Sequence, residues 1–417
     1  MMKRLTSILG LLLFLFSHHS IAQNGHLMIV GGALEDTTQS VYRRMLELAG
    51  GPEHAKIAII PTASGYATTG PLAFANNCIK YGALPWNCEI IPIACVDDPD
   101  TKEVDESTWA NNASNPDIIN RIRESNLVWF TGGDQMRTMK LLFKDGKPSP
   151  AYEAVVEVLN RGGVVAGSSA GAAIQSLIMI GGGNSIGAIT NGLATSIEQT
   201  DDTKHEGIYL TKGCGFFPFG IVDQHFSQRS RLGRLTLAAW LNKDKWSQAI
   251  GIDENTALEV NLKKGTAKVW GQNHVLVIDL EKAKGNKTDQ GYAFKDVTLS
   301  LLQQGDEIDL LNKVITIAKD KSLLKKSQTK DSFTWRQSGV MGGDGYTLLD
   351  MIESIIKNRL QTETLSNLTI LDSEKAIQFV LKSSEGTSLY ESDKQNSRFS
   401  VTHLLFDITP KKITISK

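Results

Sequence analysis

The sequence of 417 residues lacks several features that would place it in a special class of proteins. Its formal net charge is only −1, so its overall field indicates neither nucleic acid nor an anionic membrane as a partner. Beyond residue 22 no apolar run approaches the roughly 20 residues of a transmembrane helix. The hydrophobic fraction of 41% and the charged fraction of 21% are ordinary for a globular protein. These values predict a soluble body without membrane contacts, in which any charge on a substrate is met locally.

Cysteine and histidine are also sparse. The four cysteines form no CxxC pair, and two of the eight histidines lie before residue 22, so we expect no metal site and no cofactor. Cys78 and Cys88 could form a disulfide, since an exported protein would permit one, but a chain of this size does not need it. Their pairing stays open at this point.

The first 22 residues have the pattern of a secretory signal peptide. Lys3 and Arg4 precede a short apolar run, 8–16, and the small residues of 20–22 suit a cleavage site. The mature chain is then expected to begin at Gln23 and to be exported to the periplasm or the cell exterior. The alternative is a retained membrane anchor.

From residue 26 to about 172, apolar β-rich runs alternate with amphipathic helical runs. Continuous apolar strands between such helices are typical of an α/β fold with a mostly parallel sheet flanked by helices. The expected strands are 27–30, 57–60, 90–94, 127–130 and 164–166, and the expected helices are 41–49, 71–81 and 152–160. Ligand sites in such sheets lie at the carboxyl ends of the strands, where this chain carries glycine and serine.

The later part of the chain has a different pattern. Four strand-like runs are expected within 249–280, and a polar linker at 322–331 precedes a helix candidate at 346–360 and further alternating runs. The predicted organisation is a signal peptide at 1–22, a catalytic domain at 23–320 and an additional C-terminal α+β segment at 321–417. The segment could be an accessory domain, a lid, or a dimerisation element that would make the protein a homodimer.

The chemistry-bearing motif is the segment Gly167 to Gly171, which reads GSSAG between an apolar strand and a helix-like run. This is the strand–turn–helix context of a nucleophile elbow, in which a strained turn exposes one hydroxyl. The glycine spacing selects Ser169 over Ser168. The alternative is a tight glycine turn or a phosphate cradle of the same shape.

A serine needs an adjacent base, and a base needs an orienting acid. His225 follows an apolar run within DQHFSQRSRLGRL, and Glu254 follows another within GIDENTAL, next to Asp253. The alternative for the arginines of the first motif is a solvated helix face. The strand-end motif FTGGDQ offers glycine amides for an oxyanion hole.

The motifs FTGGDQ, GSSAGA, DQHFSQRSRLGRL and GIDENTAL, in this order, resemble the cyanophycinase group of the S51 serine peptidases. The resemblance covers about residues 26–320 and implies a fold similar to class I glutamine amidotransferases. It implies Ser169 as nucleophile, His225 as base and Glu254 as acid, with Gly133 and Ala170 as oxyanion donors. The substrate-binding residues implied by the same motifs are Gln135, Asp223, Gln224, Arg229, Arg231 and Arg234.

The activity implied by this resemblance is hydrolysis of cyanophycin, a poly-aspartate whose side chains carry arginine, to β-aspartyl-arginine dipeptides. Guanidinium groups bind carboxylates in a bidentate manner, which suits a carboxylate-rich substrate. Two alternatives stay open. One is a peptidase for other aspartyl or isoaspartyl peptides, and the other is a binding protein that kept the fold without the activity.

Overall fold

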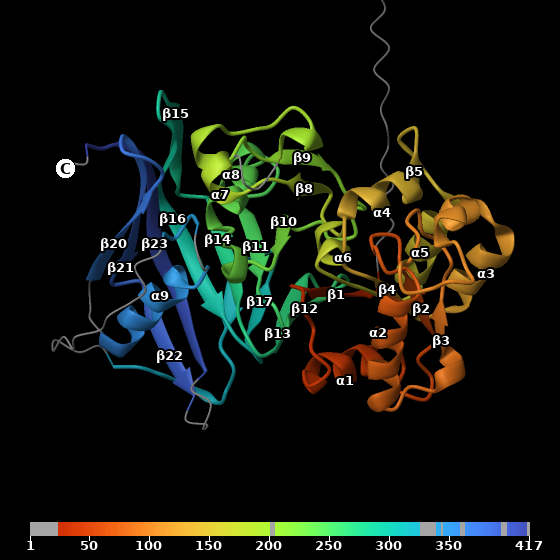
Figure 1. Cartoon of the computed structure of the whole chain (residues 1–417). Helices are drawn as coiled ribbons and strands as arrows, with labels where there is room; N and C mark the ends of the chain where they lie inside the picture. The colour runs from red at the N-terminus through yellow and green to blue at the C-terminus, as the bar shows by residue number, and fades with distance from the viewer. Residues whose placement is uncertain are drawn as a thin grey trace, which may run out of the picture.

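The computed structural model describes residues 24–200, 205–325, 339–342, 345–358, 363–392 and 398–414. The expected signal peptide and most of the expected linker lie outside these residues. In the described part of the chain, the strands form a nine-stranded sheet, a ten-stranded sheet and two small two-stranded sheets. Figure 1 shows the two large sheets side by side, with the N-terminal half of the chain on the right and the C-terminal half on the left.

The nine-stranded sheet has the order β18-β17-β13-β12-β1-β7-β4-β2-β3. Its parallel strands are β1 (His26–Val30), β2 (Ile57–Ile60), β3 (Cys88–Ile90), β4 (Leu127–Phe130) and β7 (Val164–Ser168). Its antiparallel strands are β12 (Thr256–Asn261), β13 (Thr266–Gly271), β17 (Glu307–Asp309) and β18 (Val314–Thr316). The expected fold class, a mixed α/β fold with a parallel sheet, is confirmed.

Helices cover both faces of this sheet. One face carries α1 (Gln39–Leu48) and α2 (Thr69–Lys80), and the other carries α3 (Pro116–Glu124), α4 (Gln135–Leu142), α5 (Pro150–Asn160) and the short α6 (Ala170–Ala173). Local sequence explains several helix starts. The Asp134 and Ser149 side chains cap α4 and α5 by accepting backbone N–H bonds, and Pro150 takes the first position of α5.

One expected strand is shorter than predicted. The run 90–94 was expected as a strand, but β3 ends at Ile90, and Ile91 to Ala94 continues as buried chain without strand structure. Pro92 has no N–H to donate, so the hydrogen-bonded ladder cannot continue through it. Apolar composition alone does not separate a buried strand from buried irregular chain.

The ten-stranded sheet joins strands from before and after residue 320. Its main path is β10 (Ile221–Gln224), β11 (Gln248–Ile252), β14 (Val275–Asp279), β16 (Gly291–Leu302), β23 (Phe399–Lys412), β21 (Lys375–Ser383) and β20 (Glu363–Ile370). The strands β15 (Lys284–Thr288), β19 (Lys321–Leu323) and β22 (Ser388–Ser392) attach beside it. The additional C-terminal segment is therefore continuous with the preceding sheet, while the predicted boundary near residue 320 stays a prediction.

The second sheet lies between two hydrophobic cores. One of its faces packs on the core that also contains β1, β12, α3 and α5. Its other face packs with α7 (Ser185–Thr190), α8 (Leu232–Leu241) and α9 (Thr347–Asn358). These last three helices lie in front of the left-hand sheet in Figure 1. In the two small sheets, β5 (Phe143–Lys144) pairs with β6 (Lys147–Pro148), and β8 (Ile178–Gly182) pairs with β9 (Tyr209–Lys212).

Within the described residues no helix is long and apolar enough to cross a membrane. In that same part of the chain, no group of three or more His, Cys, Asp or Glu side chains is arranged to hold a metal ion. Cys78 and Cys88, which could have formed a disulfide, are both thiols. Burial raises the pKa of the Cys88 thiol to about 11.

Candidate active site

The candidate site forms where the carboxyl ends of strands from the two large sheets meet. Residues 31–32 follow β1, and their backbone connects the sheets: the Gly31 carbonyl accepts from His225 N at 2.6 Å, and the Gly32 carbonyl accepts from Asn255 N at 3.0 Å. Ser169 follows β7, which pairs with β1 in parallel. His225 and Glu254 follow the neighbouring parallel strands β10 and β11. The sheet edges therefore bring the three predicted residues together.

Three side chains form one hydrogen-bonded series. The distance from Ser169 Oγ to His225 Nε2 is 2.7 Å, and the distance from His225 Nδ1 to Glu254 Oε1 is 2.6 Å. The His225 ring is almost completely buried, whereas the Glu254 side chain keeps 30% of its surface exposed. A neutral imidazole with its proton on Nδ1 donates to the carboxylate and accepts from the serine hydroxyl. This is the arrangement that activates a serine.

Two of these residues sit in strained backbone. Ser169 has φ 55° and ψ −111°, and His225 has φ 45°, in the left-handed region that non-glycine residues rarely occupy. The turn at Ser169 joins β7 to α6, as expected of a nucleophile elbow. Strain of this kind concentrates at functional sites, because the surrounding structure must hold it in place.

The expected oxyanion donors are the backbone N–H groups of Ala170 and Gly133. The Ala170 N–H is the first amide of α6 and has no acceptor within that helix. Gly133 is exposed and its φ is +134°, and a Cβ added to it would collide with the Ala63 carbonyl. A Cβ placed on the preceding Gly132 would lie 3.9 Å from Ser169 Oγ, so Gly132 lies beside the hydroxyl. Sequence reasoning named Gly133 and did not single out Gly132.

The predicted arginines are not equivalent. Arg234 donates to both carboxylate oxygens of Asp223, at 2.7 and 2.6 Å, and to the Gly183 carbonyl at 2.6 Å. Arg231 donates to the Gln224 carbonyl at 2.5 Å and lies 3.4 Å from Asp223. All of these side chains are buried. The structure thus brings Asp223, Arg231 and Arg234 together as a buried ionic cluster, and their contact with substrate stays a prediction.

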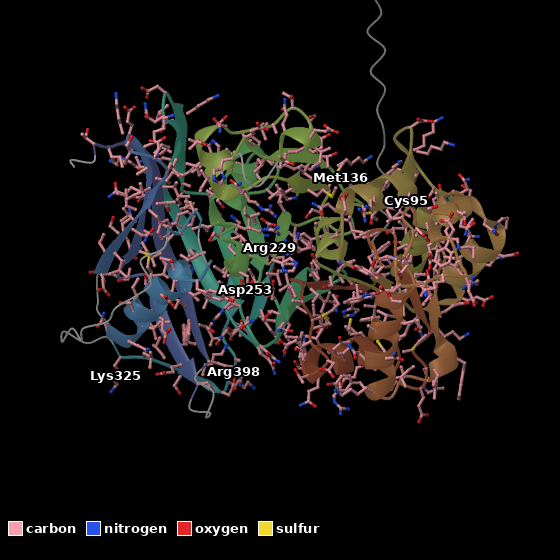
Figure 2. All side chains as sticks on the ribbon, in the orientation of Figure 1. Cys95, Met136, Arg229, Asp253, Lys325 and Arg398 are labelled. Atoms are coloured by element: carbon pink, nitrogen blue, oxygen red, sulfur yellow. The ribbon has the colours of Figure 1, made fainter. Side chains whose placement is uncertain are left out.

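Arg229 is different because it is exposed. Figure 2 labels it near the middle of the molecule in this view. It precedes α8, in the short 3-10 turn of Ser227–Arg229 directly after His225. Among the predicted arginines, Arg229 is the one placed to meet a charged group from solvent.

The two predicted amide side chains also differ. Gln135 begins α4 and donates to the Gly181 carbonyl at 2.6 Å, so its amide nitrogen already has a partner. Gln224 is buried at the end of β10, and within the described structure its Oε1 has no hydrogen-bond partner. A buried acceptor without a partner costs free energy unless something else satisfies it. Gln224 Oε1 is therefore available to a donor on a ligand or to a water molecule.

The pKa values at the site follow from burial and neighbouring charge. Burial lowers the pKa of His225, the Glu254 hydrogen bond raises it, and the positive charges of Arg229 and Arg231 lower it, leaving the pKa below its usual value. Burial alone would raise the pKa of the Asp223 carboxyl, but Arg234 and Arg231 hold it below its usual range. His225 therefore stays neutral, and able to act as a base, at a lower pH than an exposed histidine.

Several residues that position the site were not found from the sequence. The Gln228 Oε1 accepts from Glu254 N at 3.1 Å, and Asn273 Nδ2 donates to the Glu254 carbonyl at 2.8 Å. Asn255 Oδ1 accepts from Glu35 N at 2.7 Å, which ties the Glu254 turn to the loop after β1. Gln228 lay inside a recognised motif and could have been proposed. Asn273 carries no sequence signal, because its role depends on a turn that follows β13.

A cavity of about 250 Å³ opens beside the elbow, lined in part by Gly132 and Ser168. Its remaining lining is uncharged, with Leu34, Tyr42, Ser64, Gly70, Ala73, Phe74, Asn77, Trp129 and Thr131. Phe74 and Trp129 stack at 3.9 Å between ring centroids. The cavity would accept an uncharged group next to Ser169.

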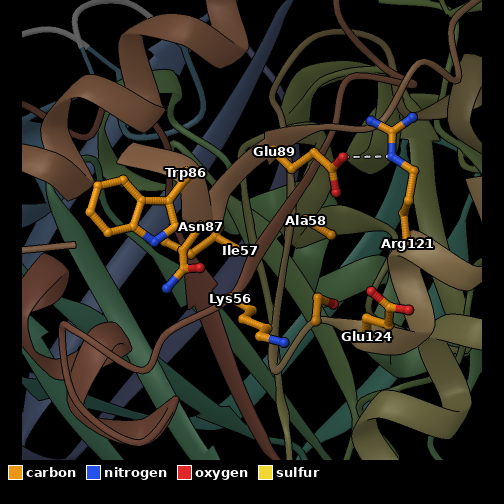
Figure 3. A pocket seen from close by; sticks show the side chains of 9 residues that line it. Lys56, Ile57, Ala58, Trp86, Asn87, Glu89, Arg121 and Glu124 are labelled. Carbon is orange, nitrogen blue, oxygen red and sulfur yellow. Dashed lines mark hydrogen bonds and ion pairs between the residues drawn. The ribbon is translucent and has the colours of Figure 1, made fainter. Parts of the chain in front are cut away.

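Other hollows lie away from this edge of the sheet. Figure 3 shows a cavity of about 190 Å³ lined by Trp86, Glu89, Arg121 and Lys56, with the Arg121–Glu89 ion pair at one side. It adjoins Ile57, where β2 begins, and so lies at the amino ends of the strands. Ligand sites in open α/β sheets lie at the opposite edge. We therefore assign the candidate site to the Ser169 region.

Comparison with known proteins identifies the family. Residues 27–267 match peptidase family S51, so the chain belongs to this family, as the four sequence motifs predicted. A cyanophycinase of Trichormus variabilis is 32% identical over 195 residues, which cover 45% of this chain and 58% of that protein. A cyanophycinase of Synechococcus elongatus is 28% identical over 265 residues, which cover 63% of this chain and 70% of that protein.

Part of the chain also aligns with a solved structure. The crystal structure of a peptidase from an acI-B1 Actinobacterium aligns with 69% of this chain and 97% of its own, at 21% identity and a TM-score of 0.44. The family match over residues 27–267 includes Ser169, His225 and Glu254 but ends before most of the ten-stranded sheet.

Proposed function

We propose that this chain is a serine peptidase that hydrolyses cyanophycin to β-aspartyl-arginine dipeptides through a Ser169–His225–Glu254 triad. The observation that carries the proposal is the series Ser169 Oγ to His225 Nε2 at 2.7 Å and His225 Nδ1 to Glu254 Oε1 at 2.6 Å, built on a strained elbow. Family membership and the relatives named cyanophycinase support the substrate class.

In the first half of the reaction, Ser169 Oγ attacks the scissile carbonyl carbon while His225 Nε2 takes the hydroxyl proton. The carbonyl oxygen becomes an oxyanion, for which the Ala170 and Gly133 N–H groups are the proposed donors. The tetrahedral intermediate collapses as the bond to the leaving amine breaks, and His225 Nε2–H gives its proton to that amine. The product is an acyl-enzyme at Ser169.

In the second half, water replaces the amine. His225 takes a proton from the water, whose oxygen attacks the acyl carbon, and the second intermediate collapses to release the carboxylic acid and restore the Ser169 hydroxyl. Glu254 accepts the His225 Nδ1 proton in a hydrogen bond and stabilises the imidazolium that forms in each half. No cofactor or metal is required for these steps.

Substrate recognition is assigned to predicted residues that lie close to His225 in the sequence. Cyanophycin carries both carboxylate and guanidinium groups, and exposed Arg229 suits a carboxylate. Gln224 Oε1, which has no partner in the described structure, suits a donor such as a guanidinium N–H. The buried cluster of Asp223, Arg231 and Arg234 would form the wall behind these groups. Export by the first 22 residues remains part of the proposal.

A second candidate is hydrolysis of aspartyl or isoaspartyl peptides that carry uncharged neighbours. The cavity of about 250 Å³ beside Gly132 and Ser168 favours it, because none of the residues that line the cavity is charged. Cyanophycin places an arginine on every aspartate, so an uncharged cavity next to the nucleophile suits an isoaspartyl peptide with an apolar residue better.

The test incubates the purified chain with insoluble cyanophycin and, separately, with β-aspartyl-leucine, and identifies the products by mass spectrometry. We expect β-aspartyl-arginine from cyanophycin. Ser169→Ala should lose about three to six orders of magnitude in rate. Ser168→Ala, altered one residue away in β7, should stay active.

Cleavage of β-aspartyl-leucine alone would replace the leading proposal by the second candidate. Turnover that survives Ser169→Ala would reject both, because the nucleophile would then be elsewhere. A loss of turnover in Ser168→Ala with activity kept in Ser169→Ala would show that the neighbouring serine is the nucleophile.

A further inference from the structure

The loop after His225 contacts the part of the chain that lies beyond the family match. We propose that the C-terminal segment, residues 321–417, positions His225 for catalysis through a buried polar series and a backbone contact. The proposal rests on the proposed function in taking His225 as the base for Ser169. The residues involved are positioning residues, since they act on the reaction through His225.

The polar series begins in the turn that follows His225. Ser227 N donates to Asp253 Oδ1 at 2.8 Å, and Asp253 Oδ2 lies 3.2 Å from His274 Nδ1. His274 Nε2 lies 2.9 Å from Gln303 Nε2. Gln303 Oε1 then accepts from Phe399 N at 2.6 Å, and Phe399 is the first residue of β23 in the C-terminal segment.

One assignment of protons satisfies every link. A neutral His274 with its proton on Nδ1 donates to Asp253, and its Nε2 accepts from the Gln303 amide, whose oxygen remains free to accept from Phe399 N. Asp253 is fully buried, and His274 and Gln303 are also buried. In a buried series each lost partner leaves the next group unsatisfied, so the members hold one another in a single arrangement.

The distal end of the series is itself anchored. Asp306 Oδ2 accepts from Gln303 N at 2.9 Å and from Lys321 Nζ at 2.7 Å, and it also contacts the Ser400 hydroxyl. The side chains of Lys321 and Asp306 are both fully buried. Ser400 and Lys321 belong to the C-terminal segment. The segment therefore holds the Gln303 backbone, through Asp306, as well as the Gln303 side chain, through Phe399.

A second contact comes from a different part of the segment. Gly345 lies against the carbonyl oxygens of Ser227 and Gln228, and a Cβ on Gly345 would collide with both. Gly345 also has φ +76°, which suits glycine. Because Gln228 accepts from Glu254 N, the turn after His225 is held between the C-terminal segment and the Glu254 strand end.

Most of these positioning residues follow the part of the chain that matches the family. The family match ends at residue 267, whereas His274, Gln303, Gly345 and Phe399 all follow it. The triad residues themselves lie inside the match. These positioning residues therefore follow the matched region, and the triad that they support lies within it.

The experiment measures the reactivity of Ser169 directly, by the rate of covalent labelling with a fluorophosphonate probe, in the full chain. Gln303→Met removes both side-chain hydrogen bonds of the series at nearly constant volume. The matched control is Gln248→Met, because Gln248 has the same 5% exposure as Gln303 and donates to the Phe219 and Leu310 carbonyls, outside the series. The melting temperature of each variant is measured in parallel.

We expect both variants to lower the melting temperature, and only Gln303→Met to slow labelling, by about 10- to 100-fold, because small displacements of a base cost that much. On the substrate, kcat should fall with KM little changed. A gentler variant, His274→Asn, keeps a donor for Asp253 and cuts only the link to Gln303, and it should slow labelling to a smaller extent. Equal labelling rates for wild type, Gln303→Met and His274→Asn would overturn the proposal and leave the series a stabilising network alone.

The labelling assay also separates this proposal from the proposed substrate. If the wild type is labelled at Ser169 but cleaves no cyanophycin, the substrate assignment fails while the comparison of variants still decides the positioning role. If the wild type is not labelled and Ser169→Ala has the same turnover, the nucleophile is wrong and the positioning proposal falls with it.

Discussion

At the scale of single residues, Asp223 and Arg234 form a buried ion pair close to the site. The guanidinium group binds both carboxylate oxygens, and its third nitrogen donates to the Gly183 carbonyl. Only 2% of Asp223 and 5% of Arg234 is exposed to solvent. With all its nitrogens engaged inside the protein, Arg234 acts first on the stability of the site and only through it on the substrate.

We expect Arg234→Met to lower the free energy of unfolding by about 3–5 kcal/mol, because it leaves the buried Asp223 carboxylate without its bidentate partner and with only Arg231, 3.4 Å away. The double variant Asp223→Leu with Arg234→Met should recover a large part of that loss, since both charges are then removed. Denaturant unfolding of the single and double variants is the measurement. Equal stability of Arg234→Met and wild type would mean that Arg234 faces the substrate pocket instead.

The depressed pKa of His225 predicts how activity depends on pH. A histidine must be neutral to act as a base, so kcat/KM should fall as pH drops through its pKa, which here lies below the usual value. Arg229 is exposed and lowers this pKa by its positive charge. We expect Arg229→Gln to raise the pKa, and therefore to shift the acid limb of the kcat/KM profile to higher pH.

The control for this shift is Arg123→Gln, which removes an equally charged side chain that pairs with Glu157 on the far helices α3 and α5. It should leave the acid limb where the wild type has it. An Arg229→Gln profile that coincides with the wild type would mean that this charge is screened by solvent and does not act on His225.

The sequence predicted the triad residues better than it predicted the contacts of the arginines. The triad was expected from the sequence motifs and from the family resemblance that they carry, and each of its side chains follows a strand. The arginines were expected in a pocket by the same resemblance. The partner of Arg231 and Arg234 is Asp223, which lies 8 and 11 residues earlier in the same motif, and only the turn between β10 and α8 folds it back onto them.

At the scale of elements, the turn of residues 31–32 after β1 leaves room for the His225 imidazole ring. A Cβ on Gly32 would overlap the His225 ring, and Gly32 has φ +119°. The carbonyls of Gly31 and Gly32 also accept from His225 N and Asn255 N. This short turn therefore sets the position of the base and of the strand end that carries Glu254.

We expect Gly32→Ala to reduce kcat by at least about 100-fold, because the methyl group displaces the imidazole from Ser169. The matched control is Gly51→Ala. Gly51 has a similar φ of +101° but no neighbouring atom within 4 Å of an added Cβ, so it carries the backbone strain without the collision. Both variants should lose a comparable amount of stability, measured by thermal unfolding. Similar activity in the two variants would contradict this account of the turn.

Elements were predicted well where a local pattern decides them. The runs at 57–60 and 127–130 are continuous and apolar because both faces of those strands are buried, and each appeared as expected. The helix expected at 346–360 is α9, Thr347–Asn358. The partner of β16 could not be predicted, because Leu299 pairs with Leu404 across more than a hundred residues and no local signal encodes that choice.

At the scale of the whole molecule, the C-terminal segment completes a core that begins before it. The same hydrophobic cluster contains Leu235 and Leu237 of α8, Leu299 of β16, and Ile352 and Phe406 of the segment. The strand β23 covers the edge of β16 along most of its length. Without the segment, this core and this strand edge would both face solvent.

We expect a chain ending at residue 320 to fail to fold into a stable monomer, because it exposes a long apolar strand edge and half of a core. Soluble yield, circular dichroism and fluorophosphonate labelling of the truncated and complete chains are the measurements. A soluble truncated chain with a cooperative unfolding transition and wild-type labelling would contradict this expectation. It would also show that the family region is self-sufficient.

The join between β16 and β23 has a consequence for the timing of maturation. Ser169, His225 and Glu254 all emerge from the ribosome well before Gly345 and Phe399, at about 5–20 residues per second. During those seconds the nascent chain carries all three reactive side chains but lacks the strand and the glycine that hold the turn after His225. Full nucleophilicity would therefore arise only after Gly345 and Phe399 have been made and have packed, so that folding of this late segment sets the onset of activity.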